Sequence, residues 1–277
     1  MGSVKAKLLA TVAAATVTVV STAAVAADLP PPIAPPPVYK PPVDFGGWYL
    51  RGDIGFSHQR IKNVEFVPGP TLPPLDSQTT LSVGTEIGSI FGLGIGYQYA
   101  WFRFDVTGEY RGNATFHSVN RIVAAGNVFP ETNHGIKSEW VVLANVYADL
   151  GTWWCVTPFI GAGIGGAYNT ISNFTDIAVI QNGNNFAATA SKWNMAWALH
   201  AGLAYKVTPN FTVELAYRYL NLGNAETGVL TGFDGTFQGQ MEKINGLTSH
   251  DVKLGVRWLL NPPAPELAAP PPLMRKG

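Results

Sequence analysis

Charged side chains recur at every second position along several segments, and they are the residues in which the chemistry of this chain is concentrated. The clearest segment runs from Phe102 to Arg111, where Arg103, Asp105 and Glu109 alternate with apolar residues. Acids and bases at this spacing can form ion pairs or line a polar site. A period of two is typical of an extended strand, whose side chains point to opposite faces in turn.

The pattern returns elsewhere with charge confined to one face. We expect ten side chains to form a charge network inside the fold: Arg51, Asp53, Arg103, Asp105, Glu109, Arg111, Glu214, Arg218, Lys253 and Arg257. The polar faces also hold Asp149, Lys206 and Asp251, which makes seven positive charges against six negative. Charges removed from water must be paired, so a near balance suits a closed interior. We expect the arginines among them to bridge the carboxylates.

A catalytic or metal-binding constellation is harder to find. Ser249 and His250 are adjacent, but neighbours on a strand point to opposite faces and cannot form a nucleophile–base pair. Ser138 or Ser191 could meet a histidine only through folding, so a lipid hydrolase stays an open but weaker alternative. One cysteine and no paired-histidine spacing predict no metal site. We expect a protein that is not an enzyme.

Composition points to a membrane. Of 277 residues, 47% are hydrophobic and 13% charged, against about 25% charge in ordinary soluble domains. The body of the chain has no apolar run of about 18 residues, which excludes helical spans there and favours a barrel. The formal net charge is zero and the basic residues are scattered, so no nucleic-acid partner is expected.

The two ends read differently from the body. Lys5 and Lys7, an apolar stretch and Ala24-Val25-Ala26 predict a cleaved signal peptide over 1–26, with an uncleaved anchor as the alternative. Residues 27–46 and 261–277 hold 14 of the 21 prolines and predict extended tails, either spacers or contacts for a periplasmic or cell-wall partner. The barrel is expected over 47–260.

Eight strands are expected in the body, each long enough to cross a bilayer when tilted. Their spans are Gly47–Ser57, Ser89–Tyr99, Trp101–Gly112, Ser138–Leu150, Thr157–Asn169, Trp193–Val207, Phe211–Asn221 and Ser249–Leu260. Short turns around Ala100, at 151–153 and at 208–210 alternate with long loops at about 58–88, 113–137, 170–192 and 222–248. This asymmetry is typical of an outer-membrane barrel and predicts extracellular loops and periplasmic termini.

The two strand faces decide what points inward. One face carries the charges and many glycines, and the other carries most of the tryptophan, tyrosine and phenylalanine. A barrel of eight strands is only just wide enough for side chains to fill, so the rings cannot fit inside. We therefore predict an all-β, eight-stranded antiparallel up-and-down transmembrane barrel with aromatic girdles against lipid, where lipopolysaccharide is a contact. A soluble ligand-holding barrel is the alternative.

Several segments resemble a known family. Ala27-Asp28-Leu29-Pro30 followed by Gly47-Trp48-Tyr49-Leu50-Arg51-Gly52 is similar to the mature start and first strand of small alphaproteobacterial outer-membrane β-barrel surface proteins, the porin-like, opacity and hemin-binding type. The segments 156–167, 203–211 and 215–219 resemble that family's fifth, sixth and seventh strands. The family ends at an aromatic residue, whereas Leu260 and a proline tail stand here.

The resemblance implies a surface protein of the cell outer membrane that contributes to envelope integrity and surface interactions. It also implies an alternative, hemin or another small ligand bound at the loops, for which His58, His117 and His134 are the candidates because an exposed axial ligand could sit there. Ordinary solvated histidines are the more frequent situation in loops. A narrow pore is a further alternative, and the sequence leaves the oligomeric state open.

Overall fold

The computed structural model describes residues 46–70, 74–178, 183–234 and 239–260. These residues form strands and turns without a helix, and none of them belongs to a helix long and apolar enough to cross a membrane. The predicted signal peptide and both proline-rich tails lie outside the described residues.

Twelve strands follow one another along the chain. They are β1 (Gly47–Arg60), β2 (Asn63–Val67), β3 (Ser77–Thr85), β4 (Gly88–Tyr99), β5 (Phe102–Ala124), β6 (Asn127–Asp149), β7 (Val156–Ala178), β8 (Gly183–Ala187), β9 (Ala190–Lys206), β10 (Phe211–Glu226), β11 (Leu230–Gly232) and β12 (Met241–Leu259).

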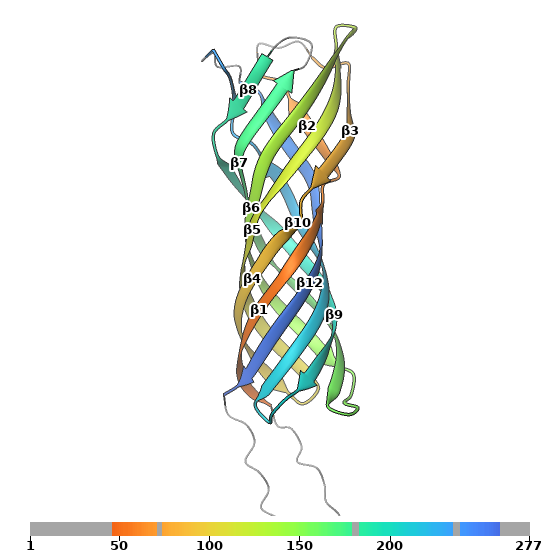
Figure 1. The fold of residues 1–277 in the computed structure, drawn as a ribbon, viewed down its shortest axis with the longest axis vertical. Coiled ribbons are helices and arrows are strands. Elements are labelled where there is room, and N and C mark those ends of the chain that lie inside the picture. The colour runs from red at the N-terminus through yellow and green to blue at the C-terminus, as the bar shows by residue number, and fades with distance from the viewer. Residues whose placement is uncertain (1–45, 71–73, 179–182, 235–238, 261–277) are drawn as a thin grey trace, which may run out of the picture. The chain divides into compact units, whose positions relative to one another are not determined.

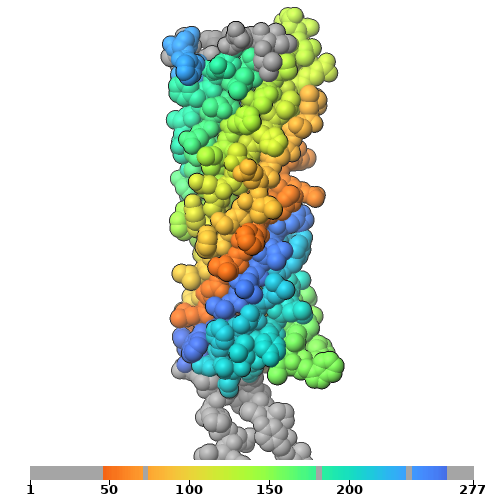
Figure 2. Space-filling view, in the orientation of Figure 1, coloured from red at the N-terminus to blue at the C-terminus, as the bar shows by residue number. Residues whose placement is uncertain are grey.

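Eight of these strands close into a ring by antiparallel pairing. The order is β1-β4-β5-β6-β7-β9-β10-β12, and β12 pairs with β1 to close it (Figure 1). In the space-filling view the two strands from opposite ends of the chain lie side by side on the front face (Figure 2). Closure removes every edge, which a sheet in lipid requires because unpaired backbone groups are costly there. The prediction of an eight-stranded up-and-down barrel is confirmed.

The three short turns predicted from the sequence are present and lie at one end of the ring. They connect β4 to β5 at Ala100, β6 to β7 at 150–155, and β9 to β10 at 207–210. β1 begins and β12 ends at the same end, because Leu260 donates its backbone N–H to Trp48. We call this the short-turn end. The positive φ angles of Ala100, Trp154 and Cys155 show how tightly these turns bend.

The outer face of the ring carries an apolar band nine or more residues tall. On β5 it begins at Phe102 and ends at Tyr110, and on β10 it begins at Phe211 and ends at Tyr219. Aromatic side chains border the apolar band at both of its edges, one at the short-turn end and one at the opposite edge, which we call the upper aromatic border. The short-turn border has Trp48, Tyr99, Trp101, Trp153, Trp154, Tyr205 and Trp258, all half or more exposed. The other border has the cross-strand pairs Tyr110–Trp140, Tyr168–Trp193 and Trp197–Tyr219, with ring centroids 5.0–5.4 Å apart.

The long loops predicted for residues 113–137 and 170–192 are wrong, since most of these residues continue the strands. β5, β6 and β7 each run for 23 residues. At about 3.3 Å per residue such a strand is roughly 75 Å long, about twice what a bilayer requires. The segments 58–88 and 222–248 likewise contain strands, including β2, β3 and β11.

The reason for this error is an inversion of polarity. Beyond the upper aromatic border the outward positions become polar, as at Thr115 and His117, while the inward positions become apolar, as at Phe116 and Phe174. The alternation continues with a polar outer face, because water replaces lipid outside the sheet, while the inner face holds both apolar and buried polar side chains. A prediction that recognises strands by an apolar, lipid-facing side therefore ends each strand at the upper aromatic border.

Bulges interrupt several strands beyond the upper aromatic border. The pairing register shifts after Arg111 on β5, at Asn173 on β7 opposite the segment from His134 to Ile136, and on both sides of Gly223 on β10. Gly223 and Gly246 adopt φ of 76° and 65°, a left-handed conformation that favours glycine. We call the part of the barrel beyond these bulges the extension. It contains β2, β3, β8, β11 and the far parts of the long strands.

Candidate functional site

Arginines near the short-turn end hold the first half of the inward charge network. Arg51 lies 2.7 Å from Asp105 and 2.9 Å from Asp53, measured from its terminal nitrogens to the carboxylate oxygens. Arg103 lies 2.9 Å from both Glu214 and Asp149. Because β1, β5, β6 and β10 contribute these partners, the ion pairs cross the interior and not merely neighbouring strands.

Aromatic side chains also contact the charged residues in this first half of the network. The guanidinium carbon of Arg103 lies 4.8 Å from the ring centroid of Tyr147 and 4.7 Å from that of Phe159. The Tyr49 hydroxyl donates to Asp105 over 3.0 Å. A cation stacked between two rings is stabilised by their electron-rich faces.

The second half of the network lies nearer the bulges. Arg218 pairs with Glu109 at 2.6 Å and with Asp251 at 2.7 Å, and Arg111 pairs with Asp251 at 2.9 Å and with Glu139 at 3.1 Å. Lys137 also bonds Glu139. These side chains are almost entirely buried.

Lys253 connects the two halves. Its ammonium lies 2.5 Å from Glu109 in the second half and 3.5 Å from Asp53 in the first. The structure thus places all ten sequence-predicted network residues inside the barrel and in contact with opposite charges. Arg257 is included through Glu214, 3.4 Å away.

The sequence analysis did not include two residues that lie in the charge network. It also assigned to the inward polar face one residue that the structure places outside. Lys137 and Glu139 were missed because Lys137 fell in a predicted loop, although both continue the inward phase of Val141 and Leu143. Lys206 is exposed at the short-turn end instead of lying inside. The described network then contains seven basic residues, Arg51, Arg103, Arg111, Lys137, Arg218, Lys253 and Arg257. Its seven acidic residues are Asp53, Asp105, Glu109, Glu139, Asp149, Glu214 and Asp251.

An apolar cluster begins beside the second half of the network, at Val141 and Leu143, and continues into the extension. Its largest members include Phe66, Phe116, Ile171, Phe174, Leu220, Leu222, Ile244 and Leu247. The rings of Phe116 and Phe174 stack with centroids 6.2 Å apart. Apolar packing thus follows the ion pairs along the interior, and buried polar side chains share the interior of the extension with it.

The three candidate histidines lie on strands and not in loops. His117 and His134 face each other in register on β5 and β6, exposed on the outer face of the extension, with ring centroids 6.5 Å apart. His58 lies on the outer face of β1 opposite His250 of β12. The structure therefore brings two of the three candidates together and places the third beside a histidine that was not a candidate.

Other reactive groups do not assemble into a site in the part of the chain that the structure describes. Ser249 is buried and donates to Asp251, whereas its neighbour His250 lies on the opposite face, 2.6 Å from the Tyr217 hydroxyl. Ser191 lies 2.9 Å from the Thr170 hydroxyl. No three His, Cys, Asp or Glu side chains among these residues are grouped so that they alone could hold a metal ion.

The closed ring, the outward apolar band with its two aromatic borders and the inward ion pairs define a transmembrane β-barrel of the outer-membrane class. The chain matches the family described as outer membrane protein beta-barrel domain over residues 12–258 and belongs to it. It is an outer-membrane β-barrel surface protein located in the cell outer membrane, where its apolar band contacts lipid.

The chain is similar to the following proteins. An uncharacterized protein of Brucella abortus is 30% identical over 246 residues, 76% of this chain and 84% of its own length. A putative adhesin of Rickettsia canadensis is 28% identical and covers 76% of this chain and 87% of its own length. Among solved structures, Neisserial surface protein A is 17% identical, covers 77% of this chain and 97% of its own, and has a TM-score of 0.41.

Removing one partner from the buried network tests its contribution to stability. Arg218→Ala leaves Glu109 and Asp251 buried without this cation, and we expect it to lower the free energy of unfolding by about 3–5 kcal/mol. Lys192→Ala is the control, because the Lys192 and Glu226 side chains are 38% and 31% exposed and such a pair contributes about 0–1 kcal/mol. Urea unfolding of the refolded chain in lipid vesicles measures both. Equal losses would contradict a special role for burial.

Proposed function

We propose that the chain is a non-enzymatic adhesion protein whose extension stands outside the cell and presents its outer face to a surface partner. One observation carries the proposal: the strands continue far beyond the apolar band, with a polar outer face and a packed interior. Such a stalk holds a contact surface away from the membrane, where a partner on another surface can reach it. The relatives named as adhesins support the same conclusion.

The direction of the extension follows from the general asymmetry of these barrels. Outer-membrane barrels have short turns on the periplasmic side and their longer segments outside. Under this rule the short-turn end, together with the predicted tails, faces the periplasm. The upper aromatic border then lies at the outer leaflet, where lipopolysaccharide is the lipid in contact.

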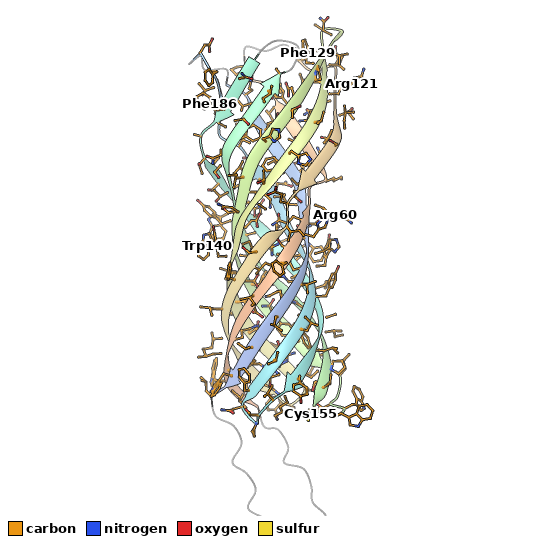
Figure 3. The ribbon with its side chains drawn as sticks, in the orientation of Figure 1. Arg60, Arg121, Phe129, Trp140, Cys155 and Phe186 are labelled. Carbon is orange, nitrogen blue, oxygen red and sulfur yellow. The ribbon has the colours of Figure 1, made fainter. Side chains whose placement is uncertain are left out.

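A free cysteine at one end offers a direct test of orientation. Cys155 is exposed at the short-turn end, and Asn127 is exposed in the β5–β6 hairpin near the labelled Phe129 at the opposite end (Figure 3). We expect a membrane-impermeant maleimide to label Asn127→Cys in a Cys155→Ser background on intact cells. Cys155 of the unaltered chain should react only after lysis. The reverse pattern would show that the extension faces inward.

Adhesion tests the function itself. The outer face of the β5–β6 hairpin carries Arg121 and His134, whereas Ser118 on the same hairpin points inside. We expect a non-adherent Gram-negative strain that displays the chain to bind epithelial monolayers at least tenfold more than the same strain with an empty vector. Arg121→Glu combined with His134→Ala should remove most of this gain, and Ser118→Ala should keep it.

Heat-modifiable gel mobility shows that each variant is folded, because a closed barrel migrates differently before and after boiling. If the strain that displays the unaltered chain binds no better than the vector control, the adhesive function is wrong. If the double variant binds as well as the unaltered chain, this hairpin face is not the contact.

Hemin binding is a second candidate function, favoured by the exposed pair His117 and His134. Both rings project from the same face of the sheet, so they cannot approach the iron from opposite sides. One of them can act as a single exposed axial ligand.

An absorbance titration tests this candidate. We expect the folded chain to shift the Soret band of added hemin, and His117→Ala with His134→Ala to abolish the shift. His250→Ala should not abolish it, because His250 is bonded to Tyr217 at the aromatic border. No shift with the unaltered chain, or a shift that survives the double substitution, would remove this function.

A further inference from the structure

Inside the extension, three carboxylates are buried without a basic partner. Glu131 on β6, Asp176 on β7 and Glu242 on β12 are 7%, 1% and 0% exposed. None of them forms an ion pair within the described residues, in contrast to every carboxylate of the network below. Buried charges are otherwise paired, protonated or bound to metal ions.

Neutral polar side chains surround these carboxylates. Asn133 is the register partner of both Ser118 and Asp176, Asn120 is the partner of Glu131, and Asn185 is the partner of Asp176. Inward-facing residues in register lie side by side, so these six line one compartment. Glu242 of β12 is buried and lies close enough for the charges of Glu131 and Asp176 to act on it. We call this compartment the acidic chamber: Ser118, Asn120, Glu131, Asn133, Asp176, Asn185 and Glu242.

Many polar atoms of the acidic chamber have no partner in the described residues. Asn120 is fully buried, and neither amide atom of its side chain has a hydrogen-bond partner. The same holds for Oε2 of Glu131 and for Oδ1 of Asp176. Two amides reach the carboxylates: Asn185 donates to Asp176 over 3.0 Å, and Asn133 lies close enough to Glu242 to act on it through a hydrogen bond. Unmet acceptors at this density are unusual in a packed interior.

The charge state of the chamber shows the same lack of compensation. Burial, with a smaller effect of nearby Asp176, raises the pKa of Glu131 to about 8. Burial and then the charges of Glu131 and Asp176 hold the pKa of Glu242 well above its usual range, against a hydrogen bond from Asn133. Burial also raises the pKa of Asp176, against the hydrogen bond from Asn185.

We propose that the acidic chamber is a binding site for one divalent cation of the calcium class. Calcium takes six to eight oxygen ligands, from carboxylates, amide carbonyls and water, and tolerates irregular geometry. No three acidic side chains converge sufficiently to hold a metal ion alone, so two carboxylates at most bind it directly. The amide oxygens of Asn120 and Asn133 and water supply the other ligands. The inference rests on the chamber itself and not on the adhesive role.

Calcium binding to the full chain tests the site. The chain is refolded in detergent without lipopolysaccharide, whose phosphates would bind the ion themselves. Equilibrium dialysis with labelled calcium should show one ion per chain, and Glu242→Gln should weaken binding at least tenfold. Glu86→Gln is the matched control, since Glu86 is an exposed carboxylate of the same extension. No binding to the unaltered chain, or equal binding to Glu242→Gln, overturns the proposal.

Melting temperature gives a second readout that a merely structural carboxylate would not give. In a chelator, Glu242→Gln should melt above the unaltered chain, because the amide removes buried repulsion. In millimolar calcium this order should reverse. If calcium does not raise the melting temperature of the unaltered chain at pH 8, the proposal fails.

Discussion

The fold depends on the pairing of charges inside a ring that cannot open. In lipid every backbone group must be bonded within the sheet, so eight strands close on themselves and leave an interior only as wide as the side chains that fill it. Charge placed there has no water to stabilise it. Pairs such as Arg51–Asp105 and Arg218–Glu109, which cross between distant strands, are the arrangement in which such charges can remain.

The same physics explains why the barrel changes character at its bulges. Below them the outside is lipid, so rings such as Trp140 face outward and charge is confined inside. Above them the outside is water, and the inside combines an apolar core around Phe116 and Phe174 with the acidic chamber. The bulges at Arg111 and Gly223 lie at this change, where an extra residue alters the phase of a strand. The extension is thus a water-soluble barrel continuous with a membrane-spanning one.

Much of the membrane-spanning half could be predicted from residue patterns alone. The alternation of Arg103 and Asp105 with Phe102 and Phe104 identifies both faces of a strand, and the turn residues fix where strands meet. The extension was missed because its outward positions, such as Thr115 and His117, resemble those of a loop. The partner of each charge, and the position of Glu131 beside Asp176, depend on register between strands, which no local pattern contains.

An apolar interior would fill the barrel as well as ion pairs do, and buried pairs often add little net stability compared with packed apolar side chains. The contribution of the ion pairs here is to fix the pairing register between strands. A strand that slips by one residue exchanges its two faces, so a slip of β5 would turn Arg103, Asp105 and Glu109 into lipid. Arginine at the bilayer midplane costs about 2–4 kcal/mol, and one slip would expose several charges together. An apolar interior behind an apolar exterior would carry no such penalty, so the charges specify which face points inward on the five strands that carry them, β1, β5, β6, β10 and β12.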